Sequence, residues 1–252
     1  MIVKLIKPIA VSFLVLFFTL PVCASTITVN EPTYGYGKIN VYYNGNVKSG
    51  LNAGMFPITY NGFDTWGFCV DLDYAVTFGE NWIDGEISIS GNYLYVEWLV
   101  AEFASDLYEA ALSNKDIASE ATALQLAIWE VRYDNVWDWD YDETTLADEY
   151  FVDPVNPING TGLFYYDRTK IENSTHYKIN DFYDDYINAL TKAVNSQSWS
   201  SFATSGDYSV FDLSKNGAST QDIIVKVVPE PTTALLLGFG LLGLCAVGRK
   251  KA

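Results

Sequence analysis

The sequence has little sulfur, little imidazole and few positive charges. Of its 252 residues 3 are Cys and 1 is His, and 15 Lys and Arg stand against 31 Asp and Glu. Two cysteines, Cys23 and Cys245, lie in apolar segments at the ends, so Cys69 is the single thiol between them. This excludes an internal disulfide in that part. The one histidine, His176, lies in a loop-like stretch and offers Cys69 no imidazole base.

The shortage of positive charge also excludes a class of partner. Five of the 15 basic residues and one of the 31 acids lie in the terminal segments, which leaves 10 basic against 30 acidic residues in 25–227. A body that is so negative repels phosphate backbones, so no nucleic-acid binding is expected. The 18 Tyr, 14 Phe and 7 Trp exclude a disordered tail and indicate a folded domain.

The C-terminal segment has the pattern of a targeting signal. Val228-Pro229-Glu230-Pro231 precedes an uncharged apolar stretch, residues 232–248, and Arg249-Lys250-Lys251 follows. The stretch predicts a single transmembrane helix in the inner membrane with a cytoplasmic basic end. The arrangement resembles the PEP-CTERM sorting signal of exported bacterial proteins, which implies processing by an exosortase, a membrane protease and transpeptidase-like enzyme. An ordinary tail anchor is the alternative.

The N-terminal segment agrees with export. Lys4 and Lys7 precede an apolar run, residues 9–20, and Val22-Cys23-Ala24 offers a cleavage site after residue 24. This pattern predicts a secretory signal peptide, with a lipoprotein box around Cys23 as the alternative. The chain is thus expected to comprise a signal peptide (1–24), an exported body (25–227) and a sorting segment (228–252). The expected location is an inner-membrane-anchored precursor and then the cell surface or extracellular matrix.

The body alternates between two kinds of periodicity. Short runs of Tyr, Ile, Val and Thr between Gly and Asn turns predict strands, and apolar residues at helical spacing predict helices. Strands at both ends with helices between them indicate an α+β domain, a β-barrel or β-sandwich with an inserted helical part. The predicted strands cover residues 38–43, 57–60, 66–77, 86–90, 208–213 and 222–227, the last two joined at Lys215-Asn216-Gly217. The predicted helices cover residues 93–112, 115–133 and 180–196.

Two residues of the body draw attention by their position in these patterns. Strict alternation from Trp66 to Leu72 puts Cys69 on the less apolar face of its strand, with Asp71. Gln125 lies at the edge of the apolar stripe of the second predicted helix. A neutral amide in such a place needs hydrogen-bond partners, because its unpaired burial costs a few kcal/mol.

The segments around both residues resemble a known pair of motifs. Phe68-Cys69-Val70-Asp71 and Leu124-Gln125-Leu126-Ala127-Ile128-Trp129 are similar to the paired motifs of bacterial surface thioester domains. The resemblance implies a thioester between the Cys69 sulfur and the Gln125 side-chain carbonyl. An amine or hydroxyl of a surface polymer, exopolysaccharide or protein would displace the sulfur once, which is attachment and not enzymatic turnover. The alternative is a small buried cysteine and a glutamine bonded to backbone.

Other readings use the acidic residues. The loop-like stretch 137–143 alternates Asp with Trp and Tyr, and could bind Ca²⁺ or present rings to sugars. With it, the body would be a non-covalent structural or carbohydrate-binding module of a biofilm matrix. Carboxylate pairs for glycan hydrolysis can be drawn from Asp71, Asp73, Glu97 and Glu102. A solvated acidic loop is favoured over a metal site, and we expect no metal or other cofactor.

Overall fold

The structure is a computed structural model. It describes residues 26–31, 36–87, 89–113, 116–133, 164–166, 178–196, 207–215, 218–219 and 221–227, and residue 240. The predicted signal peptide, the acidic stretch 137–143 and the sorting motif at 228–231 lie outside these residues. So does the predicted membrane segment 232–248, apart from residue 240.

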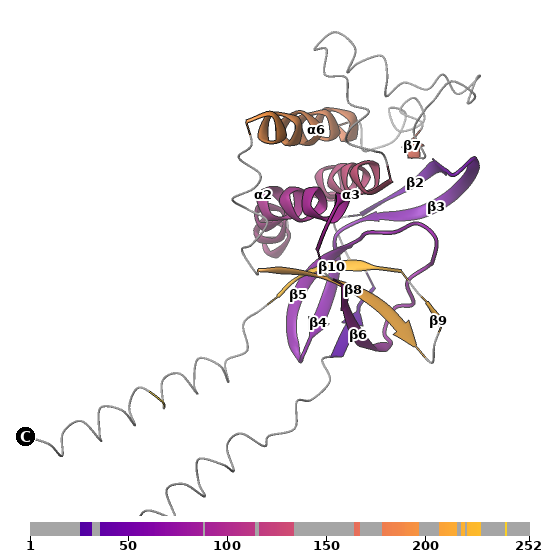
Figure 1. Ribbon diagram of the computed structural model, residues 1–252, viewed down its shortest axis with the longest axis vertical. Helices are drawn as coiled ribbons and strands as arrows, with labels where there is room; N and C mark the ends of the chain where they lie inside the picture. The colour runs from indigo at the N-terminus through magenta and orange to yellow at the C-terminus, as the bar shows by residue number, and fades with distance from the viewer. Residues whose placement is uncertain are drawn as a thin grey trace, which may run out of the picture.

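Along the described chain, strands come first, then two helices, a short strand and a third helix, and then strands again (Figure 1). The first strands are β1 (Thr26–Val29), β2 (Tyr36–Tyr43), β3 (Asn46–Gly54), β4 (Phe56–Tyr60), β5 (Phe63–Cys69) and β6 (Asn81–Ile87). The helices are α2 (Asn92–Leu112), α3 (Ala118–Tyr133) and α6 (Ile179–Asn195). The other strands are β7 (Phe164–Tyr166), β8 (Tyr208–Lys215), β9 (Ala218–Ser219) and β10 (Ile223–Lys226).

The larger sheet curls on itself. Its order is β10-β5-β4-β1-β6-β8-β9, and β10 pairs with β8 as well as with β5, so six antiparallel strands form a ring of pairings. The predicted α+β class is thereby confirmed, and the curled sheet is consistent with the β-barrel alternative of that prediction. The last two predicted strands do pair with each other, as β8 and β10, while the hairpin after β8 leads to the short strand β9.

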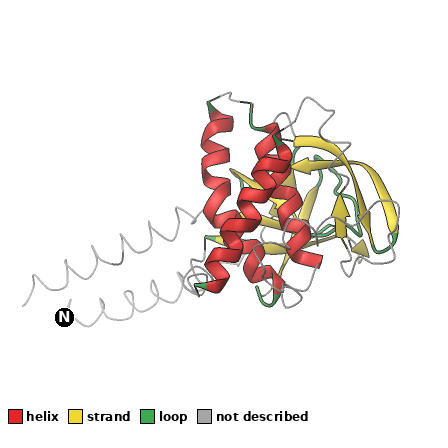
Figure 2. Ribbon diagram, turned by 90° about the horizontal axis from the view of Figure 1, so that it is seen from above, coloured by secondary structure: helices red, strands yellow, loops and turns green. Residues whose placement is uncertain are grey.

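The helices lie together on one side of the strands (Figure 2). A smaller sheet, in the order β3-β2-β7, lies against α3, and α3 also contacts α2 and α6. Every residue of α3 from Ala121 to Val131 is consequently buried. The sequence predicted Gln125 at the edge of an apolar stripe, and this was wrong because α3 is covered by other elements on all sides.

The predicted strand 66–77 was wrong in its second half. The strand ends at Cys69, because the next residues form a turn around the Asp71 carboxylate. The predicted strand 86–90 starts earlier, as β6, and ends at Ile87. The three predicted helices are confirmed, with ends that differ by at most three residues.

Candidate functional site

Cys69 ends β5 at a point where the sheet lacks one neighbour. On one side β5 pairs with β10, and the Val70 N–H continues this contact by donating to the Asp222 carbonyl at 2.8 Å. On the other side the register with β4 stops at Phe56, which pairs with Gly67. Strand β4 therefore has no residue opposite Cys69.

The side chain of Gln125 takes the place of the missing strand. The Cys69 N–H donates to Gln125 Oε1 at 3.1 Å, and Gln125 Nε2 donates to the Cys69 carbonyl at 2.6 Å. One carboxamide thus offers the acceptor and the donor that a neighbouring strand residue would offer. The fold brings together two residues that are 56 positions apart in sequence, and it puts the amide carbon of Gln125 beside the main chain of Cys69.

Both residues are removed from water. Gln125 is 0% exposed and Cys69 is 2% exposed. The sequence placed Cys69 on the less apolar face of its strand, but it did not predict that every residue from Thr65 to Leu72 is buried, on both faces. Burial raises the pKa of the Cys69 thiol well above its usual range, and the Asp71 carboxylate nearby raises it further. The sulfur is therefore a protonated thiol at neutral pH.

Asp71 shapes the turn that follows Cys69. Its carboxylate accepts the N–H of Asp222 at 2.7 Å and that of Asp73 at 3.2 Å. Gln221 Nε2 donates to the Asp71 carbonyl at 2.6 Å. These contacts fasten the end of β5 to the start of β10. Burial raises the pKa of Asp71 from 3.8 to about 6, although the N–H donors act in the opposite direction.

The raised pKa of Asp71 predicts a pH dependence of stability. Because the folded pKa of about 6 exceeds that of an unfolded Asp, the folded state binds the proton more tightly. The stabilisation is complete below the unfolded pKa and is lost as the pH rises through about 6. We expect about 1–2 kcal/mol less unfolding free energy at pH 7 than at pH 4 from this group, after allowance for solvent screening.

Denaturant unfolding at a series of pH values measures this change. The Asp71→Asn variant should lack that part of the pH dependence, whereas Asp73→Asn, at an exposed residue of the same turn, should keep it. An unchanged pH profile in Asp71→Asn would contradict the assignment.

Helix α3 contacts the turn through a second residue. The Leu72 N–H donates to the Tyr133 hydroxyl at 2.5 Å, and the Lys48 ammonium donates to the Leu72 carbonyl. Two turns before Tyr133 on the same helix lies Gln125, and one turn before Gln125 the Thr122 hydroxyl donates to the Ala53 carbonyl at 3.0 Å. One face of α3 therefore holds three separate main-chain positions of the strands.

The other motif residues are buried as well. Phe68 is 1% exposed and meets the Trp66 ring edge-on at a centroid distance of 6.1 Å. Ala127 is fully buried. Trp129, one turn after Gln125, is 1% exposed and lies 6.2 Å from the Phe164 ring. Phe68 and Ala127 therefore belong to the hydrophobic core.

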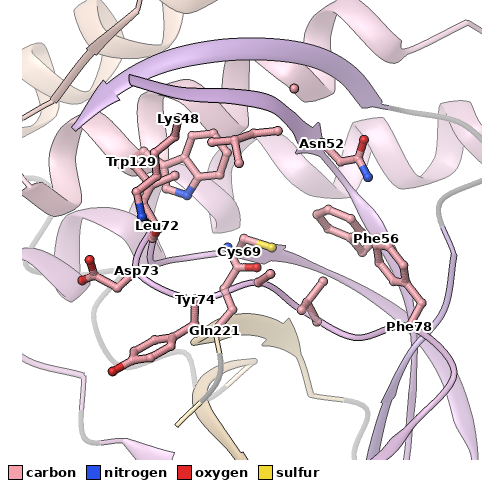
Figure 3. Close-up of a pocket in the computed structure, with 14 residues that line it drawn as sticks. Lys48, Asn52, Phe56, Cys69, Leu72, Asp73, Tyr74, Phe78, Trp129 and Gln221 are labelled. Atoms are coloured by element: carbon pink, nitrogen blue, oxygen red, sulfur yellow. Dashed lines mark hydrogen bonds between the residues drawn. The ribbon is translucent and has the colours of Figure 1, made fainter. Parts of the chain in front are cut away.

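A pocket of about 360 Å³ opens beside Cys69. Figure 3 shows the sulfur pointing into it, with the Trp129 ring and the Phe56 ring on opposite sides. Exposed residues of the turn after Cys69, Asp73 and Tyr74, contribute to its lining. The pocket offers a small molecule or side chain a way to the sulfur.

Sequence reasoning missed three residues of the site, Lys48, Tyr133 and Gln221. Each bonds to a main-chain group of Asp71 or Leu72, and such contacts leave no motif. Tyr133 could have been found, because it follows Gln125 by eight positions and so shares its helix face.

The carboxylates considered for glycan cleavage lie in different parts of the structure. Asp71 and Asp73 belong to the turn after Cys69. Glu97 is buried in α2, and burial together with the nearby Asp207 raises its pKa. Within the described part of the chain, no group of three or more His, Cys, Asp or Glu is arranged to hold a metal ion.

Comparison with known proteins identifies the C-terminal segment. The PEP-CTERM protein-sorting motif matches residues 227–251. No curated protein and no solved structure matches the chain. The motif indicates an exported protein that an exosortase-type enzyme sorts and processes. Among the helices described by the structure, none is both long and apolar enough to cross a membrane, so the predicted span at 232–248 stays a prediction.

Proposed function

We propose that this exosortase-sorted protein forms an internal thioester between Cys69 and Gln125 and uses it for one covalent attachment. The observation that carries the proposal is the pair of hydrogen bonds by which the Gln125 carboxamide contacts the Cys69 main chain. They supply what the resemblance to thioester domains requires, which is a glutamine amide held beside the cysteine. The attachment partner is a surface polymer, an exopolysaccharide or a protein amine.

The two hydrogen bonds suit the bond-forming step. The Cys69 sulfur attacks the side-chain carbonyl carbon of Gln125, the C–N bond breaks, and ammonia leaves with the thiol proton. The Cys69 N–H, which donates to Oε1, stabilises the negative charge that develops on this oxygen. The Cys69 carbonyl holds Nε2, the nitrogen that leaves. Each residue is consumed once, so the protein is a single-use acylating agent and not an enzyme.

Burial protects the proposed thioester from hydrolysis. A thioester is hydrolysed by water, and both side chains lie inside the core, at 0% and 2% exposure. The pocket, which Cys69 lines and Gln125 does not, is then the route by which an attacking amine or hydroxyl approaches the thioester from the side of the sulfur. The precursor is held in the inner membrane by residues 232–248, and the processed body acts at the cell surface or in the extracellular matrix.

Intact mass of the exported protein tests the proposal. We expect the native chain to weigh one ammonia less than its sequence, and the Cys69→Ala and Gln125→Ala variants to weigh what their sequences give. Thr191→Ala is the matched control, because Thr191 is also buried and also donates to a main-chain carbonyl but lies in α6 and does not line the pocket, and it should retain the mass loss. Alkylation of native Cys69 in a chain of unmodified mass would refute the thioester.

A non-covalent attachment module of a biofilm matrix is the second candidate. The same two hydrogen bonds are also what a purely structural glutamine would make at the end of a strand. In that case the pocket beside Cys69 binds its partner without a chemical step, and the chain has the unmodified mass before and after binding.

A further inference from the structure

Two residues that line the pocket each carry a buried polar atom without a partner in the described part of the chain. Trp129 Nε1 and Asn52 Oδ1 are both buried and form no hydrogen bond with any residue that the structure describes. Both residues line the pocket that contains the Cys69 sulfur, and in Figure 3 they lie on different sides of it. An unpaired donor and an unpaired acceptor in such a place each cost free energy, because water has been removed and nothing replaces it. A ligand that carries both an acceptor and a donor would satisfy them.

The lining charges favour a neutral ligand. Lys48 and Asp73 both line the pocket, so one positive and one negative charge stand there although the body as a whole is strongly negative. The Lys48 ammonium is bonded to the Leu72 carbonyl and lies 5.3 Å from the centre of the Tyr43 ring, which fixes a positive charge at this wall. A protonated amine has donors only, so it would leave the Trp129 N–H unpaired and would be repelled by Lys48.

The walls favour a ring with apolar faces. Phe56 and Phe78 stack with their centroids 5.9 Å apart, and Tyr74, which is 50% exposed, adds a third ring. A volume of about 360 Å³ is at the small end of ligand sites and has room for one sugar ring. Sugar rings combine C–H faces, which pack on aromatic side chains, with hydroxyls, each of which both donates and accepts.

We propose that the pocket beside Cys69 is a binding site for one neutral sugar residue, whose hydroxyls pair with the Trp129 N–H and the Asn52 side-chain carbonyl. This deepens the proposed function by naming the acceptor, and only its covalent step rests on the thioester. In that step a sugar hydroxyl oxygen attacks the Gln125 carbonyl carbon, the C–S bond breaks, and the sulfur leaves with the electron pair and takes the hydroxyl proton. The products are an ester on Gln125 and a free Cys69 thiol.

Binding is tested in the full chain with Cys69→Ala, where no thioester can form. The probes are glucose, galactose, mannose and N-acetylglucosamine as methyl glycosides, and butylamine as the amine arm. The chain has 7 Trp, so its indole N–H resonances are few, and Trp129→Phe assigns the one from Trp129. We expect at least one glycoside to move the Trp129 resonance in a saturable way.

Two variants and one control locate the site. Trp129→Phe keeps an aromatic ring and removes the N–H, and Asn52→Ala removes the acceptor. Each should weaken glycoside binding about two- to tenfold, as expected for the loss of one neutral hydrogen bond. Calorimetric titration measures this affinity, because Trp129→Phe lacks the indole resonance used above. Trp66→Phe is the matched control, because Trp66 is equally buried, its Nε1 is also unpaired, and it does not line the pocket. It should bind as the parent chain does.

The outcomes separate this inference from the thioester. Three results would overturn the sugar site, whatever the mass of the native protein: only butylamine shifts the Trp129 resonance, none of the probes shifts it, or Trp66→Phe weakens glycoside binding as much as the two pocket variants do. Saturable sugar binding in a chain whose native form shows no loss of ammonia would keep the sugar site and reject the thioester. If both hold, native protein incubated with the glycoside that binds should gain the full mass of that glycoside.

Discussion

Replacing Gln125 with alanine is expected to lower the unfolding free energy by about 3–5 kcal/mol. The substitution leaves the Cys69 N–H and carbonyl without partners inside the core, and it leaves a cavity where a fully buried side chain was. Denaturant unfolding measures the change. Both chains should carry Cys69→Ala, so that hydrogen bonding and packing are measured and no covalent bond contributes.

A second substitution at the same position makes this prediction sharper. In Gln125→Glu the protonated carboxyl can still donate to the Cys69 carbonyl. The ionised carboxylate has no donor, so one of its oxygens would lie against the carbonyl oxygen and repel it. Burial raises the folded pKa of such a carboxyl above the unfolded value of about 4.3. Gln125→Glu should therefore be most stable below that value and lose stability as the pH rises through its folded pKa. A loss under about 1 kcal/mol in Gln125→Ala, or a flat pH profile in Gln125→Glu, would show that the two hydrogen bonds matter little.

Replacing Gly67 with alanine is expected to lower the unfolding free energy by about 3 kcal/mol or more. A Cβ atom there would lie 2.4 Å from the Ile224 carbonyl oxygen and 2.5 Å from Ile58 Cδ1. Strand β5 is enclosed between β4 and β10 at this point, so the methyl group can be accommodated only if the strands separate. Because Cys69 is two residues further along, the shift should also reduce the fraction of chains that lose ammonia.

Gly85→Ala is the control for this prediction. Gly85 also lies in a paired strand, but its Cβ would come no closer than 3.7 Å to the Asp212 carbonyl oxygen, an ordinary contact. Its unfolding free energy should stay within about 1 kcal/mol of the parent. Thermal unfolding of both variants measures the difference, and equal stability of the two would contradict the close packing described for Gly67.

The sequence predicted the elements whose pattern is local. Helices α2, α3 and α6 follow from apolar residues at helical spacing, and β8 and β10 from short runs of β-branched and aromatic residues. Strand β3 was missed because it is largely exposed and polar, so it has no alternation to detect. The early end of β5 was missed because the turn at Asp71 depends on a hydrogen bond from the N–H of Asp222, which is 151 residues away.

The sequence indicated the two central residues of the candidate site but not the residues that surround them. The sequence singled out Cys69 and Gln125 through their resemblance to a pair of motifs, and the structure puts them in contact. No local pattern shows that β4 ends opposite Gly67, and this is why a side chain, and not a strand, meets Cys69. The pocket and its unpaired Trp129 nitrogen likewise depend on residues from β3, β4, the turn after β5 and α3.

The position of β10 has a mechanical consequence. Strand β10 is the last one before the sorting motif, and it is bonded on both sides, to β5 and to β8. A pull on the C-terminal end that runs along β10 would have to shear two ladders at once, which resists force better than opening one ladder pair by pair. The same strand meets Cys69 at Ile223, so tension from the tail would reach Gln125 through only a few bonds in the core.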